Sequence, residues 1–189
     1  MRELALHILD IVENAIDAHA HHIDLSVVEN LDEDRLQITV QDDGQGMDAE
    51  MVKRVRDPFF TTRSTRHVGL GIPLFAAAAE RCRGELAIQS TPGQGTIIGA
   101  TFQHSHIDRA PLGDLPSTLM GILLHARPLD LIYTPRIRVE STEHRFELDT
   151  REIKQQLGDV PLVYPAVRRW LGEYIAQGEK GLKEKACQN

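Results

Sequence analysis

The stretch Asp10-Ile-Val-Glu-Asn14-Ala-Ile-Asp17-Ala decides the fold of this chain, because it combines an apolar helix face with a row of polar side chains. Asp10, Asn14 and Asp17 are four and three residues apart, so they stack on one side of a helix. The apolar residues that recur at the same spacing predict a packed opposite side; they are Leu4, Ile8, Ile11, Val12, Ala15 and Ile16. This pattern places a row of possible ligands beside a core.

Further along the chain, glycine motifs follow in a fixed order. They are Asp42-Asp-Gly-Gln-Gly46, Gly69-Leu-Gly71 and Gly93-Gln-Gly-Thr96, and Asp57-Pro-Phe-Phe-Thr-Thr-Arg63 lies between the first two. The sequence has no Gly-x-x-x-x-Gly-Lys-Ser/Thr, and neither glycine pair has the third Gly of a dinucleotide fingerprint. No twelve-residue calcium loop follows Asp42. A nucleotide site in this chain must therefore be built in another way.

Taken together, the ordered motifs resemble the N, G1, F, G2 and G3 boxes of the GHKL superfamily, which includes gyrase, MutL and bacterial sensor histidine kinases. The resemblance covers roughly residues 1–104 and is closest to the ATPase domains of histidine kinases. It implies an α+β fold, a two-layer α/β sandwich of the Bergerat type with a mixed, mostly antiparallel sheet covered by helices. It also implies ATP and Mg²⁺ as cofactors.

Asn14 is the candidate metal ligand. Its amide oxygen is a hard, neutral ligand that Mg²⁺ accepts beside phosphates and water, and Asp10, one turn earlier, can hold a water for attack. Glu13 lies about 100° around the helix from Asn14, so we assign the role of catalytic base to Asp10. The superfamily often has Glu where Asp10 stands. The shorter Asp side chain weighs against hydrolysis more than against binding.

Asp42 is the candidate for adenine recognition, because a carboxylate at a strand end can accept the exocyclic amine. Gly44 and Gly46 let the backbone turn tightly and approach the base, whereas Asp43 is expected to be a turn residue. The resemblance adds Thr96 as a second base contact, since the G3 Thr has that place in the superfamily.

Residues 58–67 are expected to form a mobile lid anchored by Phe59 and Phe60. Its basic and hydroxyl side chains can reach phosphates, and the amides after Gly69 can do so at the start of a helix. The full set of expected ATP contacts is Asn14, Asp17, Asp42, Gly44, Gly46, Met47, Phe60, Thr61, Thr62, Arg63, Gly69, Leu70, Gly71 and Thr96.

Alternation and turn residues predict the elements around these motifs. Residues 23–28 and 36–40 form one expected hairpin, and residues 85–90 and 96–102 form another. Residues 73–82 have a helix pattern, with Pro near the start and Gly84 as the stop.

The composition limits the class of protein. The formal net charge of −7 over 189 residues argues against general nucleic-acid binding. Cys82 and Cys187 are too far apart in sequence to suggest a disulfide framework. The chain opens without an apolar signal, and no apolar run is long enough to span a bilayer. These features predict a cytoplasmic protein that binds neither nucleic acid nor membrane.

The chain is expected to divide into an ATP-binding domain, residues 1–106, and a small α+β module of unknown function, residues 107–189. In the module we expect a helix over 116–125 capped by Ser117, a hairpin of 129–139 with 145–148, and helices over 151–157 and 166–176. Trp170, Leu171 and Tyr174 would line the apolar side of the last helix, and residues 180–185 would fray. The whole-chain pattern, including Phe146-Glu-Leu-Asp-Thr-Arg151 and Leu157-Gly-Asp-Val-Pro161, also resembles stand-alone ATP-binding proteins that accompany iron-only hydrogenases.

Three functions remain open from the sequence. None of the nine histidines has the His-Glu or His-Asp context of a phosphoacceptor, which predicts a kinase module that phosphorylates a partner protein in trans. The alternative is an ATP-operated switch, similar to anti-sigma factors, in which the ordered lid binds a partner. The third is simple hydrolysis with Asp10 activating water.

Overall fold

The computed structural model describes residues 3–57, 70–124 and 129–188. The predicted contacts Phe60, Thr61, Thr62, Arg63 and Gly69 lie outside these ranges. In chain order, the elements are α1 (Leu4–Asp17), β1 (His22–Asn30), β2 (Arg35–Asp42), α2 (Ala49–Arg54), α3 (Gly71–Arg81), β3 (Leu86–Thr91), β4 (Gly95–Gln103), α4 (Leu115–Leu123), β5 (Asp130–Val139), β6 (Thr142–Arg145), β7 (Leu148–Asp149), α5 (Thr150–Leu157) and α6 (Pro165–Cys187).

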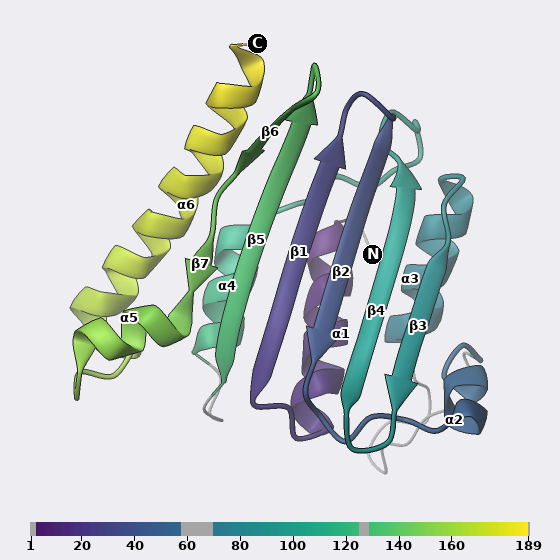
Figure 1. Cartoon of the computed structure of the whole chain (residues 1–189), viewed down its shortest axis with the longest axis horizontal. Coiled ribbons are helices and arrows are strands. Elements are labelled where there is room, and N and C mark those ends of the chain that lie inside the picture. The colour runs from purple at the N-terminus through teal and green to yellow at the C-terminus, as the bar shows by residue number, and fades with distance from the viewer. Residues whose placement is uncertain (1–2, 58–69, 125–128, 189) are drawn as a thin grey trace.

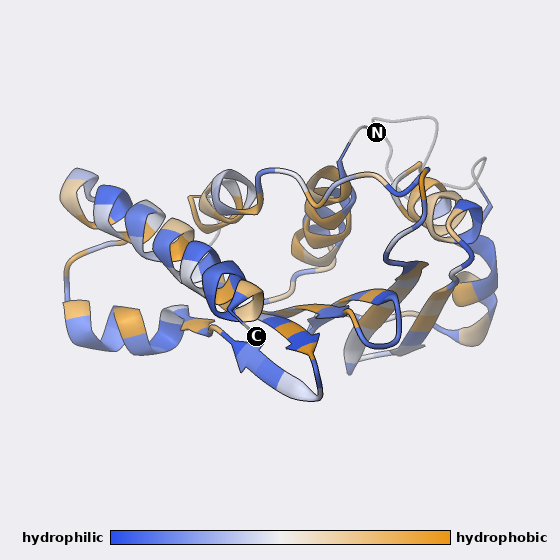
Figure 2. Cartoon of the chain, turned by 90° about the horizontal axis from the view of Figure 1, so that it is seen from above, coloured by the Kyte–Doolittle hydropathy of each residue, from blue (hydrophilic) through white to orange (hydrophobic). Residues whose placement is uncertain are grey.

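The strands form a single sheet in the order β3-β4-β2-β1-β5-β6, with β7 also paired to β5 (Figure 1). All strand pairs are antiparallel except β1 with β5, which is parallel. Helices α1, α3 and α4 lie on the same face of the sheet, as Figure 2 shows. The predicted two-layer α+β fold with a mostly antiparallel sheet is confirmed.

The core lies between these two layers. Helix α1 buries the apolar side predicted for it, and the facing strands bury alternate residues such as Ile23, Leu25, Ile38 and Phe102. Burying one such side chain contributes about 1.5–3 kcal/mol. Packing of this apolar face therefore fixes which side of α1 remains for Asp10 and Asn14, both of which are half-buried.

The register of β2, β4 and β3 brings polar residues together at one end of the sheet. Asp42, the last residue of β2, is opposite Thr96, the second residue of β4. Thr96 is in turn opposite Ser90 of β3. The fold thus aligns three polar residues across one end of the sheet.

The C-terminal segment extends the same sheet, since β5 lies beside β1 with Leu25 opposite Tyr133. Helix α4 begins earlier than predicted: its N-cap is Asp114, which accepts a hydrogen bond from Ser117 N at 3.0 Å. Ser117 is therefore inside the first turn, and its predicted role as the cap is wrong. The return strand also begins earlier, at Thr142, after a turn in which Glu140 and Ser141 have positive φ.

Helix α6 runs to Cys187, so the prediction that residues 180–185 fray is wrong. Leu182 is buried, and the Tyr133 hydroxyl donates to Glu179 Oε1 at 2.8 Å, which holds the second half of the helix on the sheet. The predicted apolar side is also wrong in part. Trp170 and Tyr174 stack on each other with 46% and 38% of their surface exposed, and the buried side consists of Val167, Leu171, Ile175 and Leu182.

A buried histidine joins α1 to α3. His7 is 3% exposed and stacks on Phe75, with ring centroids 5.2 Å apart. Within the described ranges, its Nδ1 has no hydrogen-bond partner. Burial lowers the pKa of His7 from 6.5 to about 4, so the folded protein holds a neutral ring.

We expect the free energy of unfolding to fall as the pH drops from 6.5 towards 4, because the unfolded chain binds a proton there and the folded chain does not. The loss attributable to His7 is about 3 kcal/mol. In His7→Leu this part of the pH dependence should disappear, as measured by urea unfolding at pH 7 and pH 4. Identical pH dependence in both proteins would show that His7 is not responsible.

Candidate nucleotide site

One cluster of predicted residues forms at the end of β2. Asp42 Oδ1 accepts from Gly44 N at 2.8 Å, and the carboxylate also accepts from the backbone of Thr96. Burial raises the pKa of Asp42, and the two backbone hydrogen bonds offset this only in part. A half-buried carboxylate with few fixed donors can bind an amine of a ligand.

The glycines allow this cluster to close. A Cβ on Gly46, whose φ is +65°, would lie 2.0 Å from Thr91 O, and a Cβ on Gly44 would lie 2.9 Å from Ala18 O. The loop of residues 43–48 between β2 and α2, here called the G1 loop because it carries most of the first glycine motif, is thus packed between the end of α1 and the β3–β4 turn. Gly93 N donates to Gln45 O at 2.7 Å across the same contact.

Asp43 is held apart from this cluster. Its Oδ1 accepts from the backbone amides of His21 and His22, at 2.7 and 2.8 Å. The prediction that Asp43 is a turn residue is consistent with these contacts, because they tie the α1–β1 connection to the G1 loop.

A second cluster forms where α1 meets the start of α3. A Cβ on Gly71, the first residue of α3, would lie 3.2 Å from Asp10 Cβ and 3.7 Å from Asn14 Nδ2. The fold therefore brings Asp10, Asn14 and Gly71 together, although Gly71 is more than fifty residues further along the chain. Leu70, the N-cap of α3, is 45% exposed.

Helix α1 connects the two clusters. Asn14 faces α3, and one turn later Ala18 O accepts from Gln45 N at 2.9 Å. Asp17, the last residue of α1, is exposed, and its proposed contact with ATP stays a prediction. Met47 enters the first cluster through its backbone, because Met47 N donates to Ser90 Oγ at 2.7 Å.

Ser90 is the site residue that the motif analysis missed. It lies between two motifs and looks like an ordinary polar residue of an alternating strand. Its position opposite Thr96 becomes visible only once the register of β3 and β4 is known. Pairing the two predicted strands in the sequence would have placed Ser90 beside Thr96 and so identified it as a site residue.

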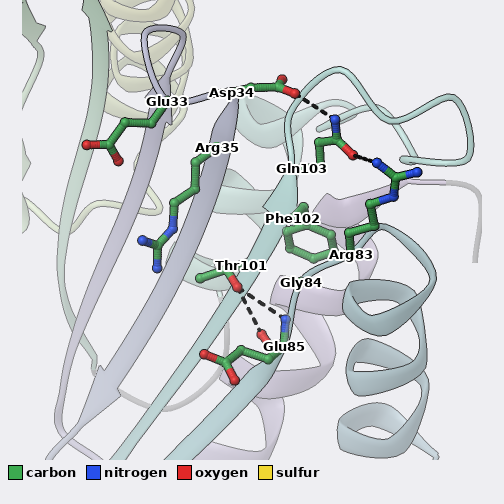
Figure 3. A pocket seen from close by; sticks show the side chains of 9 residues that line it. All are labelled: Glu33, Asp34, Arg35, Arg83, Gly84, Glu85, Thr101, Phe102 and Gln103. Carbon is green, nitrogen blue, oxygen red and sulfur yellow. Dashed lines mark hydrogen bonds between the residues drawn. The ribbon is translucent and has the colours of Figure 1, made fainter.

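A depression of about 650 Å³ opens elsewhere, lined by residues that include Arg35, Arg83 and Gln103 (Figure 3). It lies at the start of β2 and the end of β4, about 23 Å along β2 from Asp42. In it, Gln103 Nε2 donates to Asp34 Oδ2 at 2.8 Å. Among the predicted site residues that the structure describes, none lines this depression, and its arginines are mixed with acidic side chains.

Comparisons with known proteins agree with the fold and the motifs. A model of the histidine kinase-, DNA gyrase B- and HSP90-like ATPase family matches residues 2–106. This chain belongs to that family.

Individual relatives are similar over the same part. Sensor protein kinase FleS of Pseudomonas aeruginosa is 40% identical over 105 residues, which are 56% of this chain and 25% of that protein. Sporulation kinase E of Bacillus subtilis is 33% identical over 95 residues, or 50% of this chain and 13% of the kinase. The chain thus matches at most about a quarter of the length of these two kinases.

A likeness of fold extends further along the chain. The N-terminal domain of a DNA repair protein superposes on 79% of this chain and 53% of its own, with a TM-score of 0.50 and 13% identity. Among the described residues, no helix combines the length and the apolar character needed to cross a membrane.

Proposed function

We propose that this chain binds Mg-ATP between α1, α3 and the end of β2, and transfers the γ-phosphoryl group to a partner protein in trans. The observation that carries the proposal is the meeting of Asp10 and Asn14 with Gly71 at the start of α3. It puts the Asp10 carboxylate and the Asn14 side-chain amide beside the N-terminus of α3. Asp42, with its acceptor carboxylate, lies near the C-terminal end of α1, about one turn beyond Asn14.

The phosphate end of the site fits its expected ligand in two ways. Gly71 lies so close to Asp10 that a Cβ would meet the Asp10 side chain at 3.2 Å, so the backbone of α3 can approach the polar row of α1. Within the described residues, no side chain caps the N-terminus of α3. Amides there can donate to phosphate oxygens, aided by the helix dipole.

Asn14 is the proposed ligand of Mg²⁺, which when bound would neutralise charge on the phosphates. Asp10 lies one turn before Asn14 on the same side of α1, where it can accept a proton from an attacking group. Asp42 would fix the other end of the nucleotide through the adenine amine. The chain then works mainly by positioning, as phosphoryl transfer requires.

Transfer to a partner is favoured by the relatives, whose names describe sensor and sporulation kinases. Two histidines of this chain are also poorly placed to accept phosphate. His7 is buried against Phe75, and the His104 ring is 2.9 Å from Glu29 Oε2. Since none of the nine histidines has the sequence context of a phosphoacceptor, the acceptor we propose is a side chain of another protein.

Asn14→Ala is expected to lower Mg-dependent phosphate transfer by about 100-fold, the upper range seen when the environment of a bound metal is disrupted. Binding of ADP without metal should persist, because the adenine cluster around Asp42 is separate. The test incubates the chain with γ-labelled ATP and co-purifying proteins, and measures labelled partner and free phosphate separately.

Glu13→Gln is the matched control, since Glu13 is next to Asn14, equally half-buried, and points about 100° away. It should transfer phosphate like the wild type. Equal Mg²⁺ dependence in Asn14→Ala and wild type would contradict the assignment of Asn14. Free phosphate without labelled protein would favour hydrolysis, and binding without turnover would favour the ATP-operated switch.

A further inference from the structure

Ser90 makes three hydrogen bonds with the candidate adenine site. Its Oγ accepts from Met47 N at 2.7 Å, donates to Gly95 O at 2.9 Å, and lies 2.9 Å from Thr96 Oγ1. These partners come from the G1 loop and from the start of β4. Ser90 therefore joins the two glycine motifs that flank Asp42.

The direction of the third hydrogen bond follows from proton counting. A hydroxyl has one proton and two lone pairs. Gly95 O can only accept, so the Ser90 proton goes there, and Met47 N takes one Ser90 lone pair. The remaining lone pair of Ser90 must accept from Thr96, and the opposite choice would leave two acceptors, Ser90 Oγ and Gly95 O, facing each other at 2.9 Å.

Thr96 consequently has no proton left to offer a ligand. Its side chain lies between Ser90 and Asp42 in the row across β3, β4 and β2, on the helix-covered side that also holds Ile98 and Val40. Thr96 is 8% exposed, and its backbone donates to the Asp42 carboxylate. A base entering here meets two neighbouring acceptors, the Asp42 carboxylate and the Thr96 hydroxyl.

We propose that Ser90 is a positioning residue that fixes the Thr96 hydroxyl as an acceptor and so sets the preference of the site for a 6-amino purine over a 6-oxo purine. This rests on the proposed function. An amine donates to both acceptors, whereas a 6-oxo group faces two lone-pair-bearing oxygens. Without Ser90, the Thr96 hydroxyl can rotate and donate to the 6-oxo group.

The test compares Mg-ATP with Mg-ITP, because inosine has a 6-oxo group and lacks the additional 2-amino group of guanine. Calorimetric titration of wild type and Ser90→Ala gives the affinity for Mg-ATP divided by the affinity for Mg-ITP. We expect this ATP/ITP affinity ratio to fall by about tenfold in Ser90→Ala, the effect of one neutral hydrogen bond that changes direction. Most of the fall should come from tighter ITP binding.

Ser90→Thr keeps the hydroxyl and should keep the ratio of the wild type. Thr91 is the exposed neighbour of Ser90 in β3, and Thr91→Ala should also leave the ratio unchanged. Ser90→Cys keeps the strand packed but supplies only a weak thiol donor and acceptor, so it should also lower the ratio. It replaces Ser90→Ala as the test variant if Ser90→Ala does not fold. Equal weakening of ATP and ITP in the Ala and Cys variants would overturn the proposal. If the wild type binds neither nucleotide, the proposed function itself fails.

Discussion

Replacing Asp42 with Asn is expected to remove at least half of the stabilisation that Mg-ATP gives the wild type, seen as a smaller rise in melting temperature. A ligand at about 100 times its Kd stabilises the native state by about 2.7 kcal/mol. Asn supplies one acceptor oxygen and an amide that repels the adenine amine, so a charge-assisted hydrogen bond of about 1.5–3 kcal/mol is lost. Thermal unfolding with and without saturating Mg-ATP measures the difference.

Loss of folding would not explain this result. Burial raises the pKa of Asp42 above its usual 3.8, so its ionised form costs stability in the ligand-free protein. That cost is absent at low pH and develops as the pH rises from 3.8 through the raised pKa. Asn resembles the neutral carboxyl, so at pH 7 ligand-free Asp42→Asn should melt at or above the temperature of the wild type.

Asp43→Asn provides the matched control, because Asp43 is the adjacent carboxylate but accepts from His21 and His22 instead. It should lower the melting temperature without ligand and keep the response to Mg-ATP. If both variants lost the response equally, Asp42 would have no special place in adenine recognition.

Gly95→Ala is expected to destabilise the fold by about 2–5 kcal/mol, measured as a lower midpoint of urea unfolding. Gly95 has a φ of +88°, which disfavours a residue with a side chain by roughly 1–2 kcal/mol. In addition, its Cβ would lie 1.9 Å from Asp42 O, so that β2 and β4 must separate at the site. Such an overlap with backbone adds roughly 1–3 kcal/mol.

Gly93 separates the two costs. It has a φ of +75° in the same turn, and a Cβ there would meet nothing within 4 Å. Gly93→Ala should therefore lose only the conformational part, about 1–2 kcal/mol. Equal losses in the two variants would mean that the close approach of Gly95 to Asp42 has no energetic weight.

Much of the fold was predictable because its signals are local. The spacing of Ile8, Val12 and Ala15 defines the buried side of α1, and alternation defines the hairpins. The order of the motifs also predicted the family, which the comparison over residues 2–106 confirms. The boundary at residue 106 stays a prediction, and β5 lies in the same sheet as the strands before it.

By itself, the sequence determined the residue types of the site and the side of α1 from which Asp10 and Asn14 project, since both follow from helix periodicity. Only the tertiary structure decided what those residues meet. Gly71 reaches Asp10 because α3 packs on α1, and Ser90 reaches Thr96 because two strands pair in one register. Likewise, α6 continues past residue 180 because Leu182 is buried and Glu179 bonds Tyr133. Contacts between distant segments depend on how whole faces of helices and sheets pack, and the spacing of residues within one segment does not specify which other segment packs on it.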